Sequence, residues 1–493
     1  MGIVQRQGIK NSLVNYFGVI IGALSTLFIY PLDLELYGRI QIWFASASLL
    51  VPFLTFGSHS MLQKFYPYFK NNNYKGFFKL NLQIVSFFIV VTSIILYVSQ
   101  SVIFNSGFIS EAKILAFKNS LWIIYPLAVL LVYLSLARTQ TANLKRIVVP
   151  DLLQKIGLKI LIPIIFLSYF YSYISFSTLK GLLLFFHLFI LVFLIVYLKN
   201  IGGLDISTNV AYINAKKKAK EIWSYTIFSV FNQIGTILAY QTDKIMLGFL
   251  IDSTATGIYA IFFFLSGIID IPTKAIYQIS APLVSQQFQD NEIEKTEKLY
   301  KQTSLNLLLV GVFIFSLIIL NFEFIFNIMS RGEEIRPYKY LFYFLGIAKL
   351  MDMVTSLNGH IMIYSKYYRY NILFVLFLGI TNVITNYFLI KQYGIVGTGI
   401  ATAITIVLYN TLRTLFIYVK LKIHPFSVKE ILLGFIFFVV FVVNNYLILP
   451  FHFILNSMIV STVFIGLYIV IVYIAKVSLD VNKIINKVIY KKQ

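Results

Sequence analysis

Long apolar stretches recur along the whole chain and are separated by short polar connections. Each stretch is close to the roughly 20 residues that an α-helix needs to cross a bilayer. About 14 such segments are present, so the pattern predicts an all-α polytopic membrane protein. They lie near residues 11–31, 40–62, 80–104, 115–137, 152–173, 178–199, 222–250, 257–282, 303–326, 338–363, 370–391, 394–420, 430–449 and 452–475.

Composition and charge agree with this interpretation. The chain is 59% hydrophobic and 12% charged, and it lacks cysteine, which excludes disulfides and thiolate chemistry. Its net charge of +22 suits either nucleic-acid binding or basic cytoplasmic loops. If the N-terminus is cytoplasmic and the segments alternate, 29 basic residues fall inside and 9 outside, with three within segments. This bias predicts both termini in the cytoplasm and no nucleic-acid partner.

Two stretches on either side of residues 200–221 suggest an internal repeat. LDLELYGRIQIWFASASLL (32–50) and IDSTATGIYAIFFFLSGII (251–269) align with an offset of 219 residues. The aligned pairs include Asp33 with Asp252, Gly38 with Gly257, and Trp43-Phe44 with Phe262-Phe263. A repeat of six helices keeps the same topology in both copies, so its axis would lie along the membrane normal.

The repeat predicts two pseudo-symmetric six-helix lobes around a central cavity, followed by two C-terminal helices. The expected divisions are an N-terminal lobe at 1–200, a basic cytoplasmic linker at 201–221, a C-terminal lobe at 222–421, and helices 13 and 14 with a basic cytoplasmic tail at 422–493. Because no connection is long enough for a soluble domain, we expect binding to take place within the helical bundle or at its rims.

Polar side chains follow one face of several segments. Segment 222–250 carries Asn232 and Asp243 at helical spacing, and segment 338–363 carries Lys349 and Asp352. In segment 257–282, Pro272 is expected to bend the helix, because it removes a backbone hydrogen bond. The remaining candidates are Asn15, Asp270, Lys274 and Arg413.

Two interpretations of these polar residues stay open. Charges at the centre of a bilayer cost a few kcal/mol each, so they usually face a water-filled pathway. Alternatively, Asp270 with Lys274 and Lys349 with Asp352 form neutral local pairs, while the amides and hydroxyls join helices by hydrogen bonds. Arg413 lies near the inner end of its segment, where a long side chain also reaches the cytoplasm by snorkelling. Lys244, next to Asp243, is expected to be its partner or a charge at the outer rim.

Sequence motifs for catalysis are absent. There is no phosphate-binding Walker loop, no GxSxG motif and no glycine-rich dinucleotide motif, and the five histidines lack metal-ligand spacing. We therefore expect neither an enzyme nor a metal site.

Three stretches resemble the polysaccharide biosynthesis flippases, which move O-antigen or capsule repeat units and are often called Wzx-like. TDKIMLGFLIDSTATGIYAIFFFLSGIIDIPTKAIYQISAPLVSQQF (242–288) is similar to their seventh and eighth helices. YGIVGTGIATAIT (393–405) is similar to a later helical region, and NSLVNYFGVIIGALSTLFIYPL (11–32) to the first helix. The resemblance extends over the whole chain in helix number and loop size. The same superfamily holds multidrug/toxin extruders and lipid II flippases.

The resemblance implies that an undecaprenyl-pyrophosphate-linked oligosaccharide moves from the cytoplasmic to the outer leaflet of the bacterial plasma membrane by alternating access. On this hypothesis, cavity residues that bind the substrate include Lys274, Lys349, Arg413, Asn15 and Asn232. Asp243, Asp270 and Asp352 then balance these charges or carry a coupling proton or sodium ion. No other cofactor is implied. The expected partners are the lipid-linked substrate, the bilayer and other polysaccharide assembly proteins.

Three other functions are weighed against this one. A multidrug/toxin extruder usually has twelve helices, so the extra pair at 430–475 counts against it. A lipid II flippase has fourteen, but its cavity tends to hold more cations than the three basic residues found within segments here. A membrane polysaccharide polymerase usually carries a large outer loop, and the longest one expected here is about ten residues.

Overall fold

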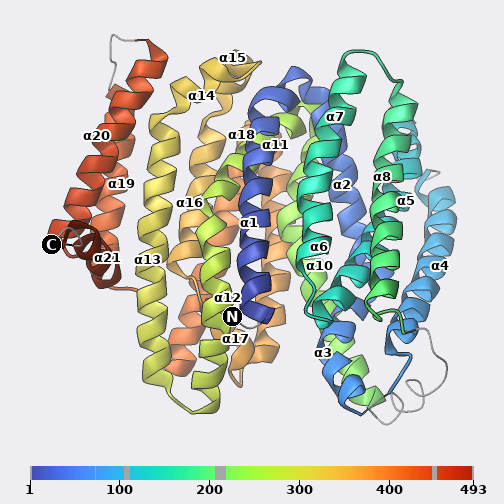
Figure 1. Ribbon diagram of the computed structural model, residues 1–493. Helices are drawn as coiled ribbons and strands as arrows, with labels where there is room; N and C mark the ends of the chain where they lie inside the picture. The colour runs from blue at the N-terminus through green and yellow to red at the C-terminus, as the bar shows by residue number, and fades with distance from the viewer. Residues whose placement is uncertain (1–2, 73, 105–110, 206–217, 447–451, 491–493) are drawn as a thin grey trace. The chain divides into compact units, whose positions relative to one another are not determined.

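A computed structural model describes residues 3–72, 74–104, 111–205, 218–446 and 452–490. All regular secondary structure in these ranges is helical (Figure 1). The sequence prediction of an all-α polytopic membrane protein is therefore confirmed. By internal contacts the chain divides into two compact units, Met1–Gly257 and Ile258–Gln493. The predicted lobe and linker boundaries stay a prediction, and most of the linker lies outside the described residues.

The first unit is built from long helices joined by short breaks. In chain order its elements are α1 (Ile3–Leu24), η1 (Ser25–Ile29), η2 (Tyr30–Leu32), α2 (Leu34–Thr55), α3 (Ser58–Asn71), α4 (Phe77–Phe104), α5 (Glu111–Asn143), α6 (Val148–Asp151), η3 (Leu152–Gly157), α7 (Leu158–Phe170), α8 (Phe176–Asn200) and α10 (Ala219–Leu250). Helix α11 (Ser253–Ile269) begins in this unit and continues into the second.

All regular secondary structure in the described residues of the second unit is helical. After α11 it contains α12 (Ile271–Gln289), α13 (Ile293–Leu320), α14 (Phe322–Ile328), α15 (Gly332–Ile335), η4 (Arg336–Tyr338), α16 (Tyr340–Val354), α17 (Asn358–Tyr364), η5 (Tyr368–Tyr370), α18 (Asn371–Leu421), α19 (Lys429–Tyr446), α20 (Phe453–Ile474) and α21 (Leu479–Tyr490).

Membrane-spanning helices account for most of the chain. In the described residues, 8 helices are long and apolar enough to cross a bilayer, and the number rises to 11 when each of three bent pairs counts as one span. One of the eight, Tyr368–Leu421, is 54 residues long and holds two predicted segments. The two predicted segments that remain, 222–250 and 430–449, fall on α10 and α19. The helix count is thus close to the predicted fourteen.

Two breaks within the spans occur where the sequence predicts them, whereas the bends between α2 and α3 and between α16 and α17 were not predicted. Helices α11 and α12 meet at an angle of 46°, and Pro272 follows directly after the break. Proline has no N–H to donate to the carbonyl four residues earlier, so the predicted bend is confirmed. Within α18, Gly394 adopts φ 60° and ψ −138°, a conformation that is essentially restricted to glycine. This residue ends one span and starts the next.

Helix α2 crosses the start of α11 with almost no space between the two backbones. A Cβ atom added to Gly38 would lie 1.6 Å from the carbonyl oxygen of Ser253, and one added to Gly257 would lie 2.1 Å from that of Leu34. Ser253 follows Leu34 by the same 219 residues that separate the two glycines. The two contacts are therefore reciprocal, since each glycine lies against the residue that corresponds to the other's partner.

The same two copies also start their helices in the same way. The side chain of Asp33 accepts a hydrogen bond from the backbone N–H of Leu36 at 2.9 Å. The side chain of Asp252 accepts one from Ala255 at 2.7 Å. An aspartate at this position satisfies a backbone donor that the first helical turn leaves unpaired. The N-caps and the glycine contacts both support the internal repeat.

The two C-terminal helices pack on α13 (Figure 1). A cluster of buried side chains joins Leu308, Val312, Leu433, Phe464 and Tyr468. At one end of α13, the hydroxyls of two serines on α20 donate to the Asn321 side-chain oxygen. Hydrogen bonds of this kind hold helices together within a membrane. These contacts fix α19 and α20 to the second unit.

Candidate functional site

A polar cluster occupies the break between α16 and α17 in the second unit. The two helices are bent by 46°, and their junction leaves residues 355–357 outside both. Asn410 of α18 donates from Nδ2 to Oδ1 of Asp352 at 2.7 Å. Its own Oδ1 accepts from the Thr355 hydroxyl at 3.1 Å and from Nδ2 of Asn358 at 3.0 Å. Asn410 therefore bridges both sides of the broken helix.

Asp270 supplies a second carboxylate at a helix break in the same unit. It stands between α11 and α12, and its Oδ2 lies 3.9 Å from Nζ of Lys349 on α16. The two side chains are 23% and 13% exposed. Lys349 and Asp270 lie near enough to Asp352 for their charges to act on it. Three of the predicted residues are therefore brought together by two broken helices.

The pairing differs from the local pairs considered from sequence. Asp270 pairs with Lys349 on another helix, and Asp352 bonds to Asn410. Lys274, one turn after Asp270, is exposed, and the described structure records no ion pair between these two residues. Spacing along one helix could not show this, because the break at Asp270 rotates the following turn away from α11.

We expect the Asp270–Lys349 pair to couple energetically. Asp270→Asn and Lys349→Met should each lower the thermal stability of the purified protein, and the double variant should lose less than the sum. A coupling of about 1 kcal/mol is expected for a partly buried pair. Thermal unfolding of the three variants in detergent measures it, with the exposed Asp290→Asn as control. Strictly additive losses would show that the two charges do not interact.

Arg413 is buried in the second unit and is 6% exposed. Its guanidinium donates to the side-chain oxygen of Asn371 at 2.5 Å and to the hydroxyl of Tyr409. The side chain is directed among helices, close to the backbone of Gly359. Snorkelling to the cytoplasm, one of the two interpretations from sequence, therefore does not describe its position.

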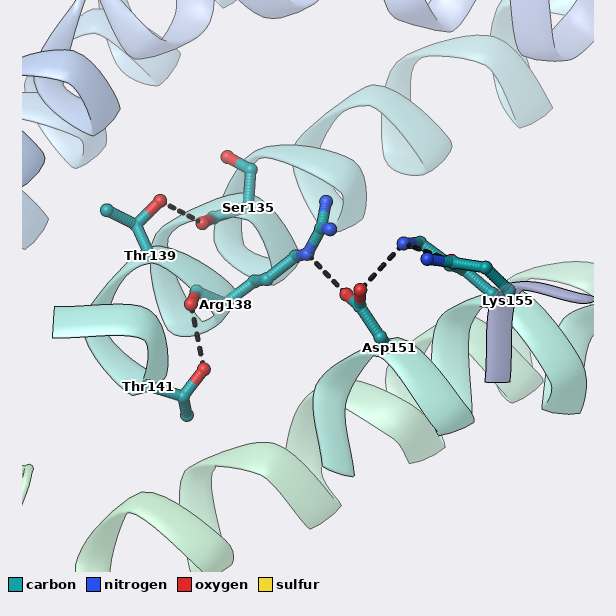
Figure 2. A network of polar contacts seen from close by, with 7 residues as sticks. Ser135, Arg138, Thr139, Thr141, Asp151 and Lys155 are labelled. Atoms are coloured by element: carbon teal, nitrogen blue, oxygen red, sulfur yellow. Dashed lines mark hydrogen bonds and ion pairs between the residues drawn. The ribbon is translucent and has the colours of Figure 1, made fainter. Parts of the chain in front are cut away.

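A charged network in the first unit involves a residue that the sequence did not single out. The Asp151 carboxylate is 2% exposed and lies between two cations (Figure 2). Its Oδ1 is 2.8 Å from Nε of Arg138 on α5, and its Oδ2 is 2.6 Å from Nζ of Lys155 on η3. Nζ of Lys155 also donates to Oδ1 of Asn15 on α1 at 2.8 Å. Asn15 is thus part of this network.

The network borders a cavity of about 640 Å³ within the first unit. Its wall comes from α2, α3, α5, α6, η3 and α10, and from Ile147 just before α6. The polar residues that line it are Ser48, His59, Gln63, Ser135, Arg138, Thr139, Asp151, Gln154 and Gln241. A cavity of this size holds a small ligand or a polar head group.

The predicted residues of α10 lie in the first unit but do not line this cavity. Asp243 is 1% exposed, and Asn232 is half-buried. Lys244 donates from Nζ to Oε1 of Gln41 on α2 at 2.9 Å, so its side chain is held by a neighbouring helix. In the described residues, no group of three or more His, Cys, Asp or Glu side chains is arranged to hold a metal.

Three basic residues that were assigned to cytoplasmic connections lie on helices and contact other groups of the first unit. Arg138 is on α5, Lys155 on η3 and Lys159 on α7. Arg138 and Lys155 bind Asp151, and Nζ of Lys159 donates to the Gly18 carbonyl at 2.8 Å. A basic residue near the end of an apolar stretch has the same sequence pattern whether it faces water or a carboxylate. The only signal was Asp151, four residues before Lys155.

Comparisons with known proteins give results at the level of fold. No protein-family model matches the sequence, and no curated protein matches it. Solved transporter structures do match. The lipid II flippase MurJ, in an inward closed conformation, has a TM-score of 0.66 and 16% identity, over 93% of this chain and 98% of that one.

Two other matches are transporters of the MOP superfamily. A MATE multidrug resistance transporter in an inward-facing conformation has a TM-score of 0.58 and 12% identity, over 83% of this chain and 98% of that one. A transporter from Pyrococcus furiosus, described by the reversed polarity of its binding pocket, has a TM-score of 0.54 and 12% identity, over 85% and 95%. This multi-span membrane protein therefore has the fold of the MurJ and MATE transporters.

Proposed function

We propose that this protein is a flippase that carries an undecaprenyl-pyrophosphate-linked oligosaccharide repeat unit from the cytoplasmic to the outer leaflet by alternating access. The observation that carries the proposal is the position of charges at two helix breaks. Asp270 lies at one break, and Asp352 lies beside the other. Charges within spans and interrupted helices are both features of substrate and ion sites in transporters.

The length of the fold supports a flippase over an extruder. The MurJ structure matches 93% of this chain, whereas the MATE structure matches 83%. Helices α19 and α20, which pack on α13, are the additional pair that the sequence counted against an extruder. These matches are to transporters and not to enzymes, in keeping with a protein that moves its substrate unchanged.

The substrate class follows from charge. Lys349 and Arg413 in the second unit, and Arg138 and Lys155 in the first, place cations among apolar helices. An anionic pyrophosphate head group would offset the cost of these charges in a medium of low dielectric constant. Asp243, Asp270 and Asp352 are our candidates for carrying a coupling proton or sodium ion. We further propose that both termini lie in the cytoplasm.

Lipid II is the second candidate substrate, because the MurJ flippase has the same fold over nearly the whole chain. Both substrates carry a pyrophosphate on a polyprenyl chain, and they differ in the saccharide. The charge pattern alone therefore does not separate them, and the lipids of a strain without the protein do.

Transport is tested most simply in liposomes. Lipid-linked oligosaccharide distributes over both leaflets on reconstitution, so a membrane-impermeant periodate reagent should oxidise only the outer share in vesicles without protein. With the wild-type protein we expect nearly all of the oligosaccharide to become oxidised. In Asp352→Asn vesicles the inner share should stay protected, because the charge at the helix break is lost. Equal protection in wild-type and empty vesicles would contradict the proposed function.

A further inference from the structure

The guanidinium of Arg138 has one edge fixed and the other directed away from the carboxylate. Its Nε atom lies 2.8 Å from Asp151, and in Figure 2 its two terminal nitrogens point away from that residue. In the part of the chain that the structure describes, these two nitrogens make no hydrogen bond. The side chain lines the cavity of the first unit and is 47% exposed, whereas Asp151 is 2% exposed. Two parallel N–H donors are thus available to a ligand.

Charge balance in the network points to an anionic ligand. Asp151 carries one negative charge, and its two oxygens lie 2.8 Å and 2.6 Å from the cationic nitrogens of Arg138 and Lys155. One positive charge is left over beside the buried carboxylate, on side chains that are themselves partly exposed. A charge in such a place is costly unless an anion or water compensates it. Of these two cations, Arg138 is the one that lines the cavity, whereas Lys155 donates to Asn15.

A second donor in the cavity wall lacks a partner. Gln154 lines the cavity from η3, one residue before Lys155, and its Nε2 atom is buried without a hydrogen-bond partner in the described residues. A buried donor that is left unpaired costs free energy that a ligand oxygen would restore. Element η3 is a π-helix, a conformation that is frequent at functional sites.

We infer that this cavity is a phosphate-binding subsite, in which the free edge of Arg138 binds two phosphate oxygens and Gln154 donates to the same group. Planar, bidentate recognition of phosphate is the geometry for which arginine is suited and lysine is not. Asp151 is a positioning residue, since it fixes the Nε edge and so directs the other edge into the cavity. This inference rests on the proposed function and adds a site for the phosphate of its substrate.

Binding to the purified full-length protein tests the subsite with three probes. Farnesyl pyrophosphate carries a polyprenyl pyrophosphate, inorganic pyrophosphate carries the anion alone, and phosphatidylglycerol carries a bilayer phosphate. Arg138→Gln should weaken the affinity for the preferred probe by about 10- to 100-fold, because it removes charged hydrogen bonds. Arg138→Lys should retain only part of the wild-type affinity for that probe, because lysine lacks the two parallel donors. Arg146→Gln, an exposed basic residue that does not line the cavity, is the matched control and should bind like wild type.

The probes separate the sources of the phosphate. Arg138-dependent binding that is tightest for farnesyl pyrophosphate supports a lipid-linked pyrophosphate, and equal binding of inorganic pyrophosphate supports a free anion in the same subsite. Arg138-dependent binding of phosphatidylglycerol alone supports a bilayer lipid. If no probe binds wild type more tightly than Arg138→Gln, the subsite is wrong. Oxidation of the full oligosaccharide pool in wild-type liposomes would then show that the proposed function still holds.

A double-mutant cycle tests the role of Asp151. In the wild-type background Asp151→Asn should weaken the preferred probe, because Arg138 is no longer held. In the Arg138→Gln background the same change should have no further effect on affinity. A residue that only supports the fold would weaken binding equally in both backgrounds, and that result would overturn its role as a positioning residue.

Discussion

Gly38→Ala should destabilise the protein by about 3 kcal/mol or more, the largest effect we expect from a single methyl group. The added Cβ would lie 1.6 Å from the Ser253 carbonyl oxygen. A backbone atom cannot move aside as a flexible side chain does, so α2 and α11 must separate. Because the contact is reciprocal, Gly257→Ala should cause a similar loss. Thermal unfolding of the purified variants, with expression level in membranes, measures both.

Gly181→Ala is the matched control. Gly181 also lies within a helix, α8, and an added Cβ would meet nothing within 4 Å. Alanine there should raise stability by roughly 0.5–1 kcal/mol through helix propensity. If Gly38→Ala and Gly257→Ala unfold at the wild-type temperature, the close crossing of α2 and α11 is wrong.

Asn410→Leu should cost about 3 kcal/mol of stability and abolish transport. The substitution keeps the approximate volume but removes the bonds to Asp352, Thr355 and Asn358. Each of these bonds contributes about 1 kcal/mol, and the buried partners that remain carry a further cost. Without Asn410, the two sides of the break between α16 and α17 lose their common partner. Thermal unfolding and the liposome assay report the two effects.

Thr411→Val gives the comparison for Asn410→Leu. It replaces a polar side chain by an apolar one on the next residue of α18, where the side chain is exposed. It should change neither stability nor transport appreciably. Wild-type transport by Asn410→Leu would mean that the bridge across the break is not needed for function.

Local features of this fold could be predicted from the sequence because they depend on neighbouring residues. Apolar length predicted the spans, Pro272 predicted a bend, and Gly394 separated two segments. The alignment of Gly38 with Gly257 gave a pair that the structure places in reciprocal contact. For the proline and the glycines the physical cause lies in the residue itself, either a missing N–H or a missing side chain.

The partners of the buried charges could not be predicted in the same way. Helical spacing proposed Asp270 with Lys274, but the break at Asp270 places that carboxylate beside Lys349. Asn410 has no charge and no unusual neighbours, and its importance comes only from the bend that it bridges. Partners on different helices depend on packing, which the order of residues along one helix does not specify.

The charged network around Asp151 shows a different limit. Arg138 and Lys155 follow the pattern of cytoplasmic loop residues, and counting them as such improved the predicted charge bias. Their side chains nevertheless meet a buried carboxylate. The positive-inside pattern indicates on which side of the membrane a basic residue lies, and it does not show which group its side chain contacts.

Mass spectrometry of undecaprenyl-linked lipids from a strain that lacks the protein tests directly whether it moves a lipid-linked saccharide. We predict accumulation of a lipid-linked oligosaccharide together with loss of the surface glycan, and the mass will identify the sugars. Accumulated lipid II would assign the second candidate substrate. Unchanged lipid intermediates, together with new sensitivity to cationic drugs, would contradict the proposed flippase function and indicate an extruder.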